Sequence, residues 1–174
     1  MKNTDTRHLK RDKDGFYRSS STKLPCDHCG WSHDCHLRPR ARCDLFLPSL
    51  PFTDETGLRK VANTIRVGKA WTERLIPNQV ISLWNSVEKR IFGHARVLSL
   101  HTGPIVGMLR DHAHANHLML DTPPDDAAKL MLEWQRRQYG PRIIHDQTQL
   151  TAIYLLRERF APPPPYRNEA EGHG

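Results

Sequence analysis

The chain has 174 residues, of which 37% are hydrophobic, which is enough for one ordinary domain with appended segments but not for two full cores. A formal net charge of +7 and a pI of about 9.5 favour phosphate-bearing partners such as RNA, DNA or nucleotides. The N-terminal segment lacks an apolar signal-like run, and no stretch is apolar enough to cross a bilayer. These features predict a cytoplasmic protein without a membrane span.

Composition divides the chain into five segments. Residues 1–23 are rich in lysine and arginine and predict a flexible basic arm. Residues 24–47 contain all four cysteines, and residues 48–57, with two prolines and a glycine, predict a linker. Residues 58–160 form the main domain. Residues 161–174 contain four consecutive prolines and predict a disordered tail, which is one possible contact for a protein partner together with the cysteine segment.

The main domain mixes strand and helix patterns. Residues 79–86 and 90–100 are short, β-rich runs bounded by turn residues, as in consecutive antiparallel strands, and residues 150–160 predict a third strand. Residues 104–118 predict a short helix, and residues 122–141 predict a longer one. This order indicates an α+β fold, in which a small curved sheet or barrel packs against two or three helices at one side.

The longer helix has recognisable end signals. Thr122 is placed to cap it and Pro123 suits its first turn, while Gly140 follows its last residues. The helical spacing of its apolar residues predicts one buried face. That predicted face consists of Ala127, Leu130, Met131 and Trp134.

The cysteines have the spacing C-x2-C-x5-C-x7-C within residues 26–43. A chain in a reducing compartment does not normally rely on two disulfides, so a metal is favoured over a disulfide knot. Two cysteines separated by two residues can chelate one tetrahedral ion, and four thiolates close its coordination shell. The segment therefore predicts a structural zinc that folds a small module. The predicted ligands are Cys26, Cys29, Cys35 and Cys43.

Two alternatives to this zinc site stay open. His28, His33 or His36 could replace a cysteine as a ligand, since imidazole also binds zinc. Four cysteines in one run could also hold an iron–sulfur cluster, which the spacing does not exclude.

The segment 63–85 carries the second informative pattern. Thr64 and Arg66 lie in an apolar strand-like run, Lys69 and Trp71 follow, and Arg74 adds a third cation. The charges suit phosphate contacts, a flat indole can stack on an unpaired base, and a hydroxyl can hydrogen-bond either group. These five residues are the candidate nucleic-acid-binding residues. The alternative is that the indole is core and the cations pair with nearby acids on a solvated surface.

Thr64-Ile65-Arg66, the Pro77-Asn78-Gln79 turn before an apolar strand, and the strand GHARVLSL at residues 93–100 resemble an ASCH domain of the PUA-like superfamily. The resemblance covers about residues 58–160. It implies a small β-barrel with a cleft that binds RNA or a nucleotide-like ligand.

One ASCH branch consists of amidohydrolases that act on N4-acetylcytidine, and the resemblance implies Thr64 as a candidate catalytic residue. The expected lysine position holds Val61 or Ala62, with Lys60 nearby but on the opposite strand face. The expected glutamate position holds Asn116 or His117. A nucleophile without an adjacent base argues against this hydrolase.

Three histidines in residues 111–117 form another candidate site. His114 and His117 would share a face of a regular helix, while His112 would point elsewhere. With Asp111, His94 or His101 they could bind a metal, and a histidine could also act in metal-free RNA cleavage. An exposed helix face beside a nucleic-acid cleft is the favoured interpretation.

The sequence therefore predicts an ASCH-like protein that binds RNA or another nucleic acid and carries a structural zinc module. One alternative is a hydrolase acting on RNA or a modified nucleoside, with Thr64, Lys60 and His117 as candidate catalytic residues. A second alternative is a protein-interaction adaptor.

Overall fold

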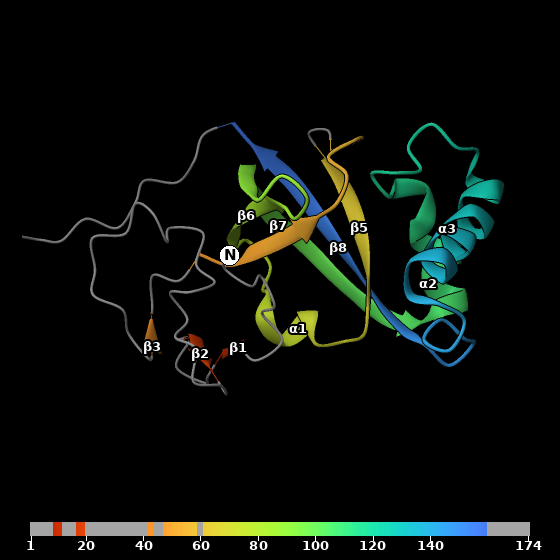
Figure 1. The fold of residues 1–174 in the computed structure, drawn as a ribbon, viewed down its shortest axis with the longest axis horizontal. Helices are drawn as coiled ribbons and strands as arrows, with labels where there is room; N and C mark the ends of the chain where they lie inside the picture. The colour runs from red at the N-terminus through yellow and green to blue at the C-terminus, as the bar shows by residue number, and fades with distance from the viewer. Residues whose placement is uncertain (1–8, 12–16, 20–41, 44–46, 59–60, 160–174) are drawn as a thin grey trace, which may run out of the picture.

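The computed structural model describes residues 9–11, 17–19, 42–43, 47–58 and 61–159. A five-stranded sheet with the strand order β4-β6-β7-β8-β5 forms its main body (Figure 1). Strands β4 and β6 run parallel and the other neighbouring pairs run antiparallel, so the sheet is mixed. Its strands are β4 Ser49–Phe52, β5 Val61–Val67, β6 Val80–Asn85, β7 Arg90–Pro104 and β8 Gln149–Glu158.

A few helices complete the α+β fold. Helices α2 and α3 lie together on one side of the sheet, while the single turn α1 lies near one end of it (Figure 1). The helices are α1 Trp71–Arg74, α2 Ile105–His112 and α3 Pro124–Tyr139, and a 3₁₀ helix, Ala113–Ala115, follows α2 directly. Within the described residues, no helix combines the length and apolar character needed to span a bilayer.

Three short strands near the N-terminus form a separate antiparallel sheet in the order β1-β2-β3. They are β1 Leu9–Arg11, β2 Tyr17–Ser19 and β3 Arg42–Cys43. The segments predicted as a basic arm and as a cysteine module lie largely outside the described residues, as does the proline-rich tail.

The main sheet curls into a half-barrel. Its register shifts between Leu83 and Trp84 in β6, and between Val97 and Ser99 in β7. Such bulges bend strands and increase their twist. The curl leaves β4 and β5 as the two edge strands of an incompletely closed barrel.

Apolar side chains cover both faces of the sheet. The face beneath α2 and α3 includes Ile65, Leu150 and Ala152, which pack with residues of both helices. The opposite face includes Ile81, Val97 and Ile153, which pack inside the curl. The strand with Thr64 and Arg66 is therefore buried on both sides over much of its length.

The predicted strands and the long helix form near their predicted positions, and the α+β prediction with a small curved sheet is confirmed. The shorter helix, predicted over residues 104–118, ends at His112. The linker boundary also differs. Ser49–Phe52 lie inside the predicted linker but form β4, with Leu50 fully buried and Phe52 3% exposed. The linker prediction does not hold for these four residues, because their alternating apolar side chains fill the curl of the sheet.

The long helix also differs in detail from its prediction. It begins at Pro124 rather than at Pro123, and the side chain of Thr122 does not cap it. Ala127 and Met131 are buried as predicted, but Leu130 is 41% exposed and Gln135 is fully buried. The buried stripe thus follows positions four residues apart, and the polar Gln135 occupies a place where the pattern predicted none.

Candidate functional site

A polar pocket lies between the two edge strands of the half-barrel. Arg66 extends from β5 and donates a hydrogen bond through Nη2 to the carbonyl oxygen of Pro51 in β4. The pocket beside this bridge has a volume of about 30 Å³, room for about two water molecules. It is lined by Phe52, Thr53, Asp54, Thr64, Ile65, Arg66, Asn116, His117, Leu118, Met131, Trp134 and Tyr139.

Within the part of the chain that the structure describes, Arg66 has one donor without a partner. Its guanidinium carbon lies 4.9 Å from the centre of the Phe52 ring, in a cation–π contact. Its Nε is buried and has no hydrogen-bond partner among the described residues. Burial lowers the pKa of Arg66, while the charge and hydrogen bonding of Tyr139 oppose the shift. An unpaired buried donor costs about 1–3 kcal/mol, so this Nε–H is a natural contact for a ligand or a water molecule.

Thr64 lies next to Arg66 on the same face of β5, because alternate residues of a strand share a face. It is 3% exposed, and its cross-strand partner is Ile153 of β8. The strand therefore presents a hydroxyl and a guanidinium together to the pocket.

His117 forms another wall of the pocket, and its tautomer follows from its contacts. Its Nδ1 lies 2.8 Å from the carbonyl oxygen of Thr56. A carbonyl only accepts, so Nδ1 donates, and Nε2 carries no proton in the neutral ring. Burial lowers the pKa of His117; the nearby charge of Arg66 adds to this effect, while the Thr56 carbonyl and Asp54 oppose it. The ring is therefore neutral at pH 7 and offers Nε2 as an acceptor or base.

The main chain holds His117 firmly in place. Its N–H donates to the carbonyl oxygen of Asn63 at 3.0 Å, and Asn63 forms a parallel bridge with Asn116 at the outer edge of β5. The ring also meets the edge of Phe52 at a centroid distance of 5.4 Å. This histidine was expected on a helix, but α2 ends at His112 and His117 lies in the turn beyond the 3₁₀ helix. The predicted shared helical face of His114 and His117 is therefore wrong.

A wider cavity of about 310 Å³ adjoins the pocket, and both are lined by His117 and Leu118. The wider cavity also carries two acidic residues, Glu55 and Asp121. Its volume reaches the lower end of the range for small-molecule sites. His117 thus faces one narrow polar space and one space large enough for an aromatic ring. The full lining is Glu55, Thr56, Gly57, Leu58, His117, Leu118, Leu120, Asp121 and Thr122.

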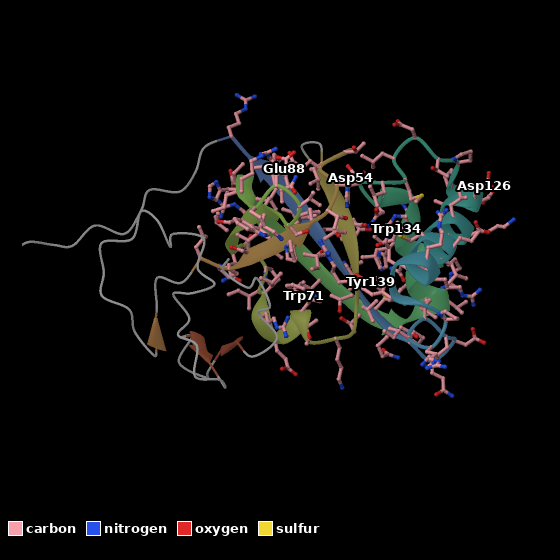
Figure 2. The ribbon with its side chains drawn as sticks, in the orientation of Figure 1. Asp54, Trp71, Glu88, Asp126, Trp134 and Tyr139 are labelled. Atoms are coloured by element: carbon pink, nitrogen blue, oxygen red, sulfur yellow. The ribbon has the colours of Figure 1, made fainter. Side chains whose placement is uncertain are left out.

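The aromatic wall of the pocket comes from helix α3. Trp134 and Tyr139 both line the pocket from α3, whereas Trp71, the first residue of α1, does not line it (Figure 2). The helical spacing predicted Trp134 in the buried face of the helix, and the sequence pattern gave Tyr139 no role. Their helical spacing gave no sign that this face would meet a polar pocket.

The five predicted nucleic-acid-binding residues separate into two groups. Thr64 and Arg66 line the pocket, whereas Lys69 is exposed beyond the end of β5. Arg74 lies over the Trp71 ring at 5.1 Å and is itself 6% exposed. Trp71 is half-buried against the core inside the curl, as the alternative interpretation expected.

Other predicted site residues lie outside the described part of the chain. These are Lys60 and the cysteines at positions 26, 29 and 35, while only the backbone of Cys43 is described, in β3. Among the described residues, no group of three or more histidine, cysteine, aspartate or glutamate side chains is arranged to hold a metal ion. The zinc and iron–sulfur hypotheses concern a segment that these residues do not include.

Comparisons with protein family models, curated proteins and solved structures find no match to this chain.

Proposed function

We propose that the protein binds nucleic acid, RNA in the first place, and that the pocket between β4 and β5 receives one edge of an unpaired base. The observation that carries this proposal is the buried Nε–H of Arg66, which has no partner among the described residues and belongs to a pocket that also contains the Thr64 hydroxyl and neutral His117. A donor, an acceptor and a hydroxyl in one narrow space suit the mixed hydrogen-bonding edge of a base.

The surroundings of the pocket support the same ligand class. Trp134 and Tyr139 provide aromatic surface, and the adjoining cavity offers room for a ring. Arg136 and Arg137 are exposed in the last turn of α3, next to Tyr139, where they can contact phosphates. The net charge of +7 and the resemblance to ASCH domains agree with this function. The proposal also includes a structural zinc ion, which is bound by Cys26, Cys29, Cys35 and Cys43.

The test is a fluorescence-anisotropy titration of single-stranded RNA, duplex RNA and duplex DNA at several salt concentrations. Arg66 bridges two strands and is a poor test residue, so we use Thr64→Val, which keeps the shape and the β propensity of the side chain. Loss of one hydrogen bond should weaken RNA binding about two- to tenfold. Binding should also fall steeply with salt, with a log–log slope of several units.

The matched control is Thr151→Val. Thr151 is a fully buried threonine of the neighbouring strand that does not line the pocket, and its hydroxyl donates to the carbonyl oxygen of Gly68 at 2.7 Å. We expect this variant to lower the melting temperature but to keep the RNA affinity. Absence of binding to all three probes, or equal weakening by both variants, contradicts the proposal.

A second candidate function is hydrolysis of an acylated nucleoside. The sequence offered no base adjacent to Thr64, but neutral His117 lines the same pocket and supports this candidate. In such a reaction the Thr64 Oγ attacks the acyl carbonyl while His117 Nε2 takes the hydroxyl proton. The bond between the acyl carbon and N4 then breaks, and His117 gives the proton to the departing N4 amine of cytidine. Water, deprotonated by His117, hydrolyses the acyl-threonine ester to acetate and free Thr64. Incubation with N4-acetylcytidine, followed by chromatography, should then yield cytidine and acetate. Turnover that survives in both Thr64→Val and His117→Gln excludes this candidate.

A further inference from the structure

Three aromatic side chains form a second cluster on the helix-covered side of the sheet. His101 of β7 and His112 at the end of α2 are in tilted ring contact, with a centroid distance of 4.8 Å and an angle of 33° between their rings. Tyr154 of β8 meets both imidazoles edge-on, at 5.6 Å from His101 and 5.7 Å from His112. None of the three residues lines the pocket between β4 and β5.

Hydrogen bonds fix the cluster before any ligand arrives. Nδ1 of His112 lies 3.0 Å from the Tyr154 hydroxyl, and Nε2 of His101 lies 3.0 Å from the Ser99 hydroxyl. The side-chain amide of Asn63 donates to the carbonyl oxygen of His112 at 2.8 Å. Both imidazoles are therefore held in one orientation, so little side-chain entropy remains to be lost on binding.

The cluster presents its outermost ring to solvent. His101 is exposed, while His112 and Tyr154 are half-buried beneath it. Burial lowers the pKa of His112, with the charges of His101 and His114 adding to the shift and Asp111 opposing it. Arg110, also nearby on α2, is paired with Asp111. His112 is thus neutral at slightly alkaline pH, so no repulsion between two charged imidazoles opposes the contact of His101 and His112 at that pH.

Asn63 connects this cluster to the pocket. Its side chain binds the main chain of His112, and its carbonyl oxygen accepts the N–H of His117. Its strand neighbour Thr64 points to the opposite face of β5, into the pocket. The two sites are therefore linked through the adjoining residues Asn63 and Thr64 of one edge strand.

We propose that the His101–His112–Tyr154 cluster is a second nucleic-acid subsite, in which one unpaired base stacks on the ring of His101. An exposed, pre-oriented imidazole on a strongly basic protein fits a base better than an apolar protein side chain, because bases carry both a π-face and an attached phosphate. The subsite rests on the proposed nucleic-acid function and adds a second point of contact on the same strand.

The experiment measures the affinity of a fluorescein-labelled 12-nucleotide single-stranded RNA for three variants at pH 8. His101→Ala removes the stacking face and should weaken binding about fivefold or more. His101→Phe keeps a flat ring without the imidazole nitrogens and should stay within about twofold of the parent protein. His145→Ala removes an exposed histidine elsewhere and should change nothing. Melting curves confirm that each variant is folded.

The outcomes separate the two proposals. If the parent protein does not bind the RNA, the proposed function fails and the subsite fails with it. If the parent protein binds and His101→Ala binds equally well, or His101→Phe is as weak as His101→Ala, only the subsite is overturned. Cleavage of the probe to a 2′,3′-cyclic phosphate end that both His101 variants abolish also overturns it, because the cluster would then be catalytic rather than a stacking surface.

Discussion

Gly57 holds the loop after β4 directly against His117, and replacing it by alanine should damage both the fold and the pocket. The residue has φ +70°, in the left-handed region that favours glycine. A Cβ at this position would lie 1.7 Å from the carbonyl oxygen of His117 and 2.8 Å from its carbonyl carbon. Neither atom is the end of a flexible side chain, so the main chain itself must move.

Two costs add in this variant. A left-handed non-glycine residue costs about 1–2 kcal/mol. Displacing packed backbone costs about 1–3 kcal/mol more, as in overpacked cores. We therefore expect Gly57→Ala to lower the free energy of unfolding by about 2–5 kcal/mol. The shift of His117 should also weaken any ligand held by its Nε2.

Gly68→Ala is the matched control, because it separates strain from collision. Gly68 has φ +86°, and a Cβ there would meet no described atom within 4 Å. Its alanine variant should lose only the strain energy of about 1–2 kcal/mol. Urea unfolding followed by tryptophan fluorescence and circular dichroism gives both values. Equal losses in the two variants refute the close packing of the loop against His117.

Three further predictions concern the buried histidine, the core and the metal. Burial holds the pKa of His117 below its usual value, so the unfolded chain takes up a proton first as the pH falls. The free energy of unfolding should therefore decrease below about pH 6.5, and it should decrease less in His117→Gln. Urea titrations at pH 7.5, 6.5 and 5.5 would measure this. A pH dependence identical in both proteins contradicts this assignment. Leu50→Ala should lower the free energy of unfolding by about 2–5 kcal/mol, and Leu130→Ala should lower it by under about 1 kcal/mol. The reason is that Leu50 is fully buried while Leu130 is 41% exposed. If chemical denaturation gave the reverse order, the burial of β4 in the core would be contradicted. Elemental analysis of the purified protein should find zinc, and this zinc should be lost in a Cys26→Ser/Cys29→Ser variant. Iron together with visible absorbance would instead favour an iron–sulfur cluster.

The strands and the long helix were predictable because their signals are local. Alternating β-branched and apolar residues produced β6, β7 and β8 near their predicted bounds, and proline and glycine bracketed α3. Strand β4 was missed because it has four residues and contains Pro51. Proline is tolerated at a sheet edge, where its missing N–H is not needed. In this edge strand the Pro51 carbonyl instead accepts the hydrogen bond of Arg66.

The candidate site was only half predictable, because sequence proximity is a poor guide to which residues meet. Arg66 and Trp71 are five positions apart, but β5 ends at Val67 and Gly68 turns the chain, so the indole packs at the end of the sheet. Trp134 and Tyr139 reach the pocket from far along the chain, because α3 packs against α2 and the 3₁₀ helix and so brings both side chains to the pocket.

His117 is a second residue whose position the local sequence pattern did not predict. A regular helix through residue 117 would have paired it with His114, but the helix ends early and the main chain of His117 pairs with Asn63 instead. In this turn the Nδ1 of His117 donates to the Thr56 carbonyl, and the ring lines the same pocket as Thr64. The position of His117 therefore depends on an edge-strand contact between residues 54 positions apart, which local periodicity does not encode.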